Sequence, residues 1–244
     1  MALDFAAQIH ALSGFDADGT GDTETGDDFD EAAAQWMTDG AKEVINILPK
    51  DLKMKCATVT TLNNSTTVMD LDSSGDILHV TRISADSSGF SYPCREIPSM
   101  YGGMAASGSG HMMYEPSVTD PIYYFDADTS GSDGKSGTLY VLPTPTANQT
   151  ADVHHVKYPV FTAGDTETYD ICQKSIIANF PDEAEYLVVL YAAIKATEYM
   201  MLYEQDAEVY SPQLQTLKQD YLTGVSALIK KGIAPQGGGR GDSR

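Results

Sequence analysis

The chain has 244 residues, with 35 acidic and 15 basic side chains and a formal net charge of -20. Hydrophobic residues make up 42% of it, which is enough for a buried core and excludes a disordered acidic polymer. This charge argues against proteins that wrap nucleic-acid phosphates or dock on anionic membranes, because both need clustered Lys and Arg. The longest apolar run, Tyr186 to Ile194, is about half of the roughly 20 residues that a membrane-spanning helix needs. The start of the chain is acidic, with no Lys or Arg before Lys42, so it does not resemble a secretory signal.

Three cysteines, Cys56, Cys94 and Cys172, lie far apart without a CxxC spacing. An odd number at such spacings gives neither a disulfide framework nor a zinc site. We therefore expect free thiols and a protein kept in a reducing compartment such as a cytoplasm.

Two helices are predicted near the start of the chain. Residues 3–13 carry apolar side chains at helical spacing. A second helix is expected to begin with Asp28 or Asp30 as its N-cap and to end before Pro49. Trp36, the single tryptophan, lies in the middle of its apolar stripe and is interpreted first as a core anchor.

The region from residue 55 to about 161 has the pattern of a β domain. Short runs rich in β-branched and aromatic residues alternate with turn signals, and no helix-length segment separates them. This excludes parallel strands joined by crossover helices and predicts an antiparallel meander or small sandwich. Residues 99–110 show no clear pattern and are expected to be an irregular loop. The predicted strands include Val59, residues 66–71, 77–83, 122–125 and 138–142, and residues 153–160.

The last third of the chain returns to helix. One helix is expected to begin at Pro181, followed by acidic residues that suit the positive end of the helix dipole. Its segment from Tyr186 to Ile194 is apolar on all sides, so its own domain or a neighbouring subunit must cover every face. Ser211 and Pro212 are expected to begin a further helix, whose apolar stripe is Leu214, Leu217, Tyr221, Val225 and Leu228.

Together these elements predict an α+β fold. Residues 1–54 and 165–231 are expected to form a helical bundle, and residues 55–164 an inserted antiparallel β domain. Residues 232–244 are Gly-rich and are expected to be a flexible tail.

An acidic segment between the first two helices has some features of a calcium loop. Two features weaken this interpretation: the twelfth position is Asp and not Glu, and no second loop is present to pair with it. A solvated acidic linker is the simpler interpretation. Positions 1, 3, 5, 6, 7, 9 and 12 of the loop are occupied by Asp16, Asp18, Thr20, Gly21, Asp22, Glu24 and Asp27.

No motif predicts catalysis or a cofactor. The sequence Gly134-Lys135-Ser136 is followed by a strand, so it lacks the helix N-terminus of a phosphate loop. His154 and His155 are neighbours on a strand and point to opposite faces, so they cannot bind one metal together. Paired catalytic carboxylates, as in a hydrolase, remain a weaker alternative because no pair stands out among the 35 acids.

Three segments carry a resemblance to a known family. They are residues 29–49, residues 181–196, and residues 139–145 followed by 156–159. These segments resemble the head-to-tail connector proteins of tailed bacteriophages. The order of helices, β insertion and helices is similar to the tail tubular protein A type of adaptor in short-tailed phages.

The resemblance implies a structural protein of the virion neck, assembled in the host bacterial cytoplasm, with no enzyme activity, cofactor or membrane. It implies a ring, commonly of twelve copies, that contacts itself, the portal protein and a downstream tail or neck protein, and lets DNA pass during packaging and ejection. An acidic wall would repel phosphates, so the DNA would pass without specific binding. The side chains expected at contacts between copies or partners are Trp36, Tyr186, Leu187, Val189, Leu190, Tyr191 and Ile194. The alternative function is a calcium-dependent or carbohydrate-binding recognition module built on the β domain.

Overall fold

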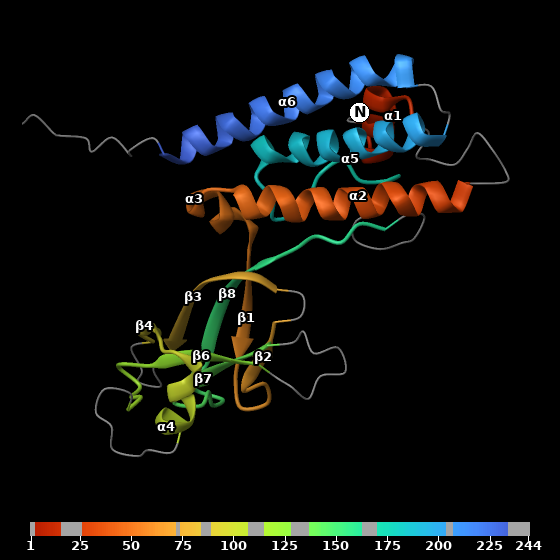
Figure 1. The fold of residues 1–244 in the computed structure, drawn as a ribbon. Helices are drawn as coiled ribbons and strands as arrows, with labels where there is room; N and C mark the ends of the chain where they lie inside the picture. Colours follow the sequence, from red (N-terminus) through yellow and green to blue (C-terminus); the bar gives the residue numbers. More distant parts are fainter. Residues whose placement is uncertain are drawn as a thin grey trace, which may run out of the picture. The chain divides into compact units, whose positions relative to one another are not determined.

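The computed structural model describes residues 3–15, 26–71, 74–83, 89–106, 115–127, 137–162, 170–203 and 207–233. The fold belongs to the α+β class, as predicted, and the chain divides into two compact units (Figure 1). The first unit is formed by residues 1–56 and 158–244, and the second by residues 57–157. Each unit is described separately below.

The helical unit is built around α5, which packs against α1, α2 and α6. Its side chains are buried on every side of the helix axis, as the apolar sequence predicts. The helices are α1 (Phe5–Ser13), α2 (Gly26–Ile47), α3 (Lys50–Lys53), α5 (Asp182–Tyr203) and α6 (Ala207–Ile233). The buried residues of α5 are Ala184, Leu187, Val188, Val189, Leu190, Ala192, Ala193, Ile194, Ala196 and Thr197.

The ends of α1 and α5 follow from local chemistry. The Asp4 carboxylate accepts a hydrogen bond from the backbone N–H of Ala7 at 2.8 Å and caps α1. Gly14 ends this helix at a φ of 74°, a left-handed conformation that favours glycine. Three acidic residues occupy the first turn of α5, where the helix dipole is positive.

Two glycines let the long helices of this unit approach closely. A Cβ added at Gly40 on α2 would lie 2.9 Å from Tyr191 Cδ1 on α5. A Cβ added at Gly224 on α6 would lie 2.5 Å from Leu187 Cδ2 on α5. At Gly40 the contact includes the Cβ and Cγ atoms of Tyr191, so glycine is needed for the observed spacing of α2 and α5, whereas the end of Leu187 near Gly224 is flexible and can move.

The β unit contains two four-stranded sheets. The first has the order β1-β8-β3-β4 and is antiparallel, and the second has the order β2-β7-β6-β5. One apolar cluster includes residues of both sheets, among them Leu62, Val80, Leu139 and Val153. The strands are β1 (Ala57–Leu62), β2 (Val68–Asp70), β3 (Ser74–Ile83), β4 (Ser91–Pro93), β5 (Arg95–Glu96), β6 (Ile122–Ala127), β7 (Gly137–Leu142) and β8 (Ala151–Lys157).

Two sequence predictions for the β unit need correction. The sheets are not purely antiparallel, because the short strand β5 pairs in parallel with β6. Residues 99–106 are not an irregular loop: Ser99–Tyr101 form a 3-10 turn and Gly102–Ala106 form α4. This short helix is held against β6, where a Cβ at Gly102 would lie 2.4 Å from the Tyr124 ring.

Two predicted helix starts were also wrong. Helix α2 already begins at Gly26, so Asp28 and Asp30 lie inside it and are not its cap. Helix α6 begins at Ala207 and runs through Pro212. Because Pro212 is exposed and close to the start of α6, it removes only one backbone hydrogen bond and does not end the helix.

Candidate assembly surfaces of the helical unit

The helix with the most apolar sequence is covered by its own chain. Leu187, Val189, Leu190 and Ile194 are all buried, with at most 7% of each side chain exposed. Helices α1, α2 and α6 of the same chain provide this cover. The side chains of α5 are therefore covered without a second copy, although the sequence alone allows a neighbouring subunit as the cover.

The other three predicted contact residues lie closer to the surface. Tyr186 is 53% exposed at the start of α5, whereas Trp36 and Tyr191 are half-buried. Tyr191 packs its ring against that of Tyr221 on α6, with centroids 6.2 Å apart.

A polar network joins the three long helices beside this packing. The Tyr221 hydroxyl donates to Glu43 Oε1 on α2 at 3.0 Å. Glu198 on α5 accepts from Lys195 at 3.0 Å and forms an ion pair with Lys218 on α6 at 2.9 Å. Burial opposes ionisation of Glu198, but the hydrogen bonds from Lys218 and Lys195 are stronger together and hold its pKa below the usual value. Burial and the neighbouring Glu43 carboxylate raise the pKa of Tyr221.

An aromatic cluster lies at the C-terminal end of α5. The Trp36 ring is 6.0 Å from Tyr199 and 5.5 Å from Phe15, and Tyr199 stacks on Tyr203. Phe15 is buried, but Tyr203 is 67% exposed and the adjacent Leu202 is 78% exposed. We call the surface formed by Trp36, Tyr199, Leu202 and Tyr203 the aromatic end.

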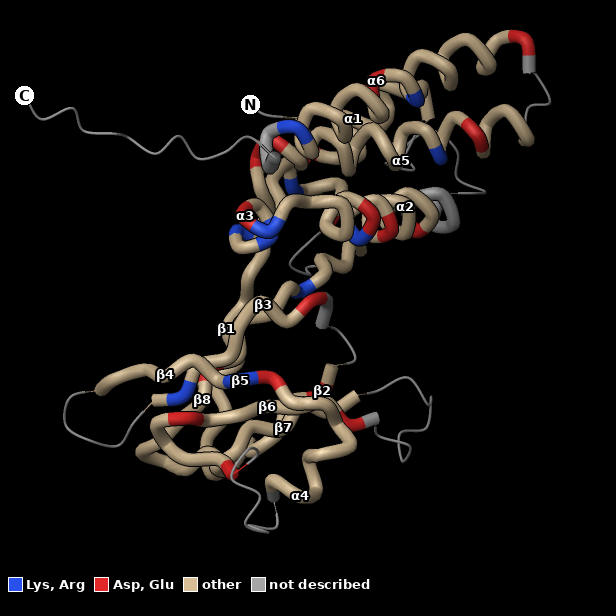
Figure 2. Tube along the Cα trace, turned by 60° about the vertical axis from the view of Figure 1, so that its left-hand side comes forward, with Lys and Arg blue, Asp and Glu red and all other residues tan. Residues whose placement is uncertain are grey.

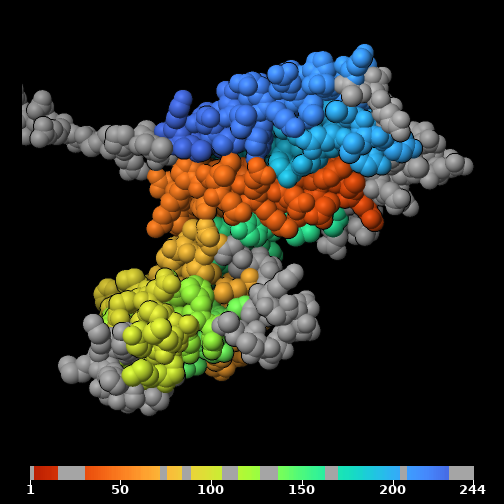
Figure 3. All heavy atoms as spheres, in the orientation of Figure 1, coloured from red at the N-terminus to blue at the C-terminus, as the bar shows by residue number. Residues whose placement is uncertain are grey.

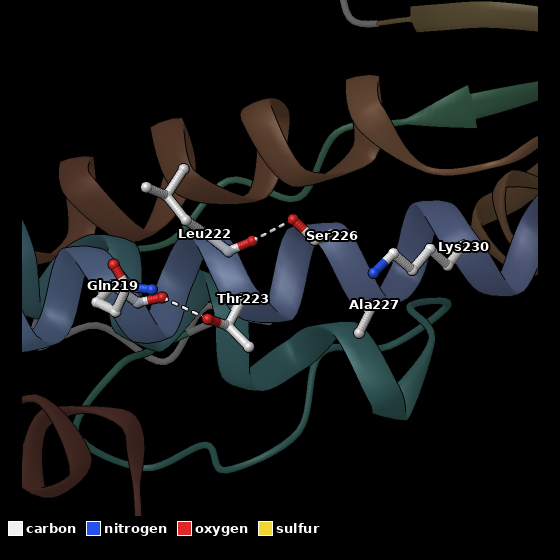
Figure 4. A pocket seen from close by; sticks show the side chains of 6 residues that line it. All are labelled: Gln219, Leu222, Thr223, Ser226, Ala227 and Lys230. Atoms are coloured by element: carbon white, nitrogen blue, oxygen red, sulfur yellow. Dashed lines mark hydrogen bonds between the residues drawn. The ribbon is translucent and has the colours of Figure 1, made fainter.

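Helix α6 presents a hollowed outer face. The space-filling view shows its residues, in darker blue, as a layer over the helical unit (Figure 3). A hollow of about 340 Å³ is lined by Gln219, Leu222, Thr223, Ser226, Ala227 and Lys230, all from this one helix (Figure 4). We call these six residues the α6 outer face.

The hydroxyl groups on the α6 outer face are already hydrogen-bonded within the helix. Thr223 donates to the carbonyl of Gln219 at 2.8 Å, and Ser226 donates to the carbonyl of Leu222 at 2.8 Å. Leu222 is 59% exposed, and Ile229 beside the hollow is 41% exposed. Sequence reasoning missed this surface because it followed the buried stripe of the helix. The sequence signal that could have found this surface is the near absence of charged residues on the side of α6 opposite the buried stripe.

Basic residues gather at α3. Lys50, Lys53 and Lys55 lie on it or directly after it (Figure 2). Lys55 pairs with Glu183 at the start of α5 at 3.3 Å. Helix α3 also contacts α6.

The described part of the chain contains no candidate metal site. Those residues include no group of three or more His, Cys, Asp or Glu side chains that could hold a metal ion. Of the predicted calcium loop, Asp16, Asp18, Thr20 and Asp22 lie outside the described residues, and Asp27 belongs to the first turn of α2. The predicted loop at residues 134–136 also lies outside them.

The described histidines of β3 and β8 and the three cysteines have structural contacts or burial. His154 stacks on His79 with ring centroids 3.9 Å apart, whereas the buried ring of His155 hydrogen-bonds to Thr60. The three cysteines are free, as predicted. Burial raises the pKa of Cys56 to about 11 and that of Cys94 to about 12, so both thiols stay protonated at neutral pH.

None of the helices in the described ranges has the length and hydropathy needed to cross a bilayer. The exposed features of the helical unit are instead an aromatic end and an outer helix face with little charge. Such surfaces are typical of structural proteins that assemble with other proteins.

Comparison with known proteins agrees with this class. A family model described as SU10 adaptor protein matches residues 14–240. The match covers most of the chain, which therefore belongs to the SU10 adaptor protein family, a structural family of phage head-to-tail adaptors and not an enzyme family. The predicted resemblance to head-to-tail connector proteins is confirmed at this level. No curated protein matches the chain.

Proposed function

We propose that this adaptor forms a closed ring between the portal protein of the phage head and a downstream tail or neck protein. The family match over residues 14–240 is the observation that carries this proposal. The ring would contain twelve copies, as is common for connectors, and would follow the tail tubular protein A arrangement. It would be assembled in the host bacterial cytoplasm and become part of the virion neck.

The second part of the proposal concerns the genome. A ring below the portal surrounds the path of the DNA during packaging and ejection. Each copy carries a net charge of -20, so the assembled ring repels phosphates over most of its surface. The DNA would pass through the lumen without specific binding.

Assembly on phage heads tests the first part. The purified full-length chain is mixed with DNA-filled heads that carry the portal, and the particles are examined by negative-stain electron microscopy. We expect a ring of added density below the portal, and none on heads that lack the portal. A chain that stays monomeric in solution by light scattering, and also adds no ring to portal-bearing heads, would contradict the proposal.

The passage of DNA has a separate test. Fluorescence anisotropy with labelled double-stranded DNA should show no binding to the assembled ring at physiological salt. Tight and salt-sensitive binding would mean that the DNA meets a basic surface, and this would contradict a repelling lumen. The calcium- or carbohydrate-binding alternative has no observation in its favour among the described residues.

A further inference from the structure

Apart from Lys230, the α6 outer face can lose its water at low cost. Between Val209 and Ile229 the only charged residues are Lys218 and Asp220, and Lys218 is paired with Glu198. The hydroxyls of Thr223 and Ser226 donate to carbonyls of their own helix and keep these bonds when water leaves. Burial of an unpaired polar group costs about 1–3 kcal/mol, and these two hydroxyls avoid that cost.

The side chains of the aromatic end are large, unlike several small side chains of the α6 outer face. Leu202 is 78% exposed and Tyr203 is 67% exposed. The hollow of about 340 Å³ on α6 is bordered by the small side chains of Thr223, Ser226 and Ala227. Large apolar and aromatic side chains that enter a shallow hollow lined by small ones are the usual anchors of protein interfaces.

The net charge of the chain limits which partner can bind these two surfaces. Two copies with a net charge of -20 repel each other, so a contact between them must lie where charge is absent or opposite. The one charged residue in the lining of the hollow is Lys230. The exposed Glu208 lies in the first turn of α6, five residues after Tyr203 along the chain. The lining of the hollow therefore carries a positive charge, and the first turn of α6 carries a negative one.

We propose that the aromatic end of one copy docks on the α6 outer face of the next copy, with Glu208 facing the neighbour's Lys230. This inference rests on the proposed function and names the contact between neighbours in the ring. Because the contact joins two different surfaces, a docked pair still has one free surface of each kind, one on each copy. Such a contact repeats from copy to copy until the ring closes.

The size of α6 indicates how strong one such contact is. The α6 outer face runs from Gln219 to Lys230, about 18 Å of helix, and a face about 10 Å wide provides about 180 Å². A stable interface of standard size buries about 800 Å² per partner. A single contact through α6 is therefore weak, and covalent trapping is the appropriate way to detect it.

Disulfide trapping between differently substituted copies tests the proposal. One full-length chain carries Ser226→Cys in the α6 outer face, and another carries Leu202→Cys in the aromatic end. Both positions are exposed, so neither change should disturb the fold. With copper phenanthroline as the oxidant, we expect a disulfide-linked dimer to form about tenfold faster in the mixture than in either chain alone.

Matched controls separate docking from random collision. A Val59→Cys chain, substituted at a half-exposed position of the β unit, is mixed with the Ser226→Cys chain. The unsubstituted chain, with Cys56, Cys94 and Cys172 in place, gives the background. Cross-linking no faster than with Val59→Cys would overturn the proposal. So would a Ser226→Cys chain that links to itself as fast as the mixture, because two α6 helices would then pair symmetrically.

A charge exchange tests the orientation. Adding Lys230→Glu to the Ser226→Cys chain places two carboxylates together and should slow trapping severalfold. Adding Glu208→Lys to the Leu202→Cys chain should restore the original rate. No restoration by the exchange would overturn the pairing of Glu208 with Lys230.

The disulfide-trapping experiment and the assembly experiment on phage heads can fail independently, so their results test the contact and the proposed function separately. Rings on portal-bearing heads without trapping between positions 202 and 226 would overturn this contact and leave the proposed function standing. Efficient trapping without rings on such heads would support the contact and overturn the proposed function.

Discussion

The two longest helices of the C-terminal region show that a hydrophobic sequence and a binding surface are different properties. Helix α5 is apolar on all sides, and its own chain buries Leu187, Leu190 and Ile194. Helix α6 is amphipathic, and Leu222 and Ser226 lie on its exposed side. The apolar content of α5 is used to hold one copy together. The low charge of the α6 outer face is what makes it suitable for contact between copies of an acidic protein.

The largest expected effect comes from a direct test of this difference. Leu190→Ala removes a fully buried side chain from the centre of α5 and should lower the free energy of unfolding by about 3 kcal/mol. Leu222→Ala, at a 59% exposed position of α6, should change it by less than about 0.5 kcal/mol.

Urea unfolding followed by tryptophan fluorescence measures both variants. Trp36 is the only tryptophan and lies in the helical unit, so its emission reports on that unit alone. Equal destabilisation by the two substitutions would contradict the assignment of α5 to the core and of Leu222 to the surface.

A smaller effect is expected at the close contacts between helices. Gly40→Ala brings a methyl group against the Cβ and Cγ atoms of Tyr191, which cannot move without shifting the whole ring. Overpacking costs about 1–3 kcal/mol and helix propensity returns about 1 kcal/mol, so a net loss of about 1 kcal/mol is expected. Gly224→Ala meets the flexible end of Leu187 and should be close to neutral. The same fluorescence assay compares them, and a larger loss at Gly224 would show that α6 packs on α5 more rigidly than α2 does.

Removal of one hydroxyl tests the polar network. Tyr221→Phe deletes the hydrogen bond from α6 to Glu43 on α2 but leaves the ring packed against Tyr191. Glu43 is exposed and regains water, so the loss of stability should be about 0.5–1 kcal/mol. No change in the urea midpoint would mean that this hydrogen bond does not hold α6 to α2.

The smallest effect should depend on pH. The pKa of Glu198 is held below its usual value, so its ion pairs stabilise the fold above the unfolded pKa and are lost as pH falls through the folded pKa. Because the side chain is about one-third exposed, Glu198→Gln should cost only about 0.5 kcal/mol at pH 7. The difference from the unsubstituted chain should vanish once the pH has fallen below the folded pKa of Glu198. A difference that persists at that pH would point to packing and not charge.

Much of the fold could be predicted from local patterns. The start of α5 after Pro181 and the strands around Val80, Val141 and Val153 follow from helix signals and β-branched runs that act over a few residues. Residues 99–106 could not be predicted as helical, because the contact of Gly102 with the Tyr124 ring is distant in sequence. The parallel pairing of β5 is non-local for the same reason.

The candidate site was harder to predict than the fold. The apolar character of Leu187, Val189, Leu190 and Ile194 indicates core residues as readily as contact residues, because the chain can cover them itself. The α6 outer face has no motif, since Gln219, Thr223 and Ser226 are ordinary residues of an exposed helix side. Only their position in the structure, together with the charge of the whole chain, identifies them as a surface that another copy can cover.

A cryo-electron microscopy reconstruction of the adaptor on portal-bearing heads tests the account most directly. We predict a ring in which the α6 outer face lies at the boundary between neighbours, against the C-terminal end of the adjacent α5, while the core of each α5 stays enclosed by its own chain. A ring with the α6 outer face open to solvent, or heads without any ring of this protein, would contradict the account.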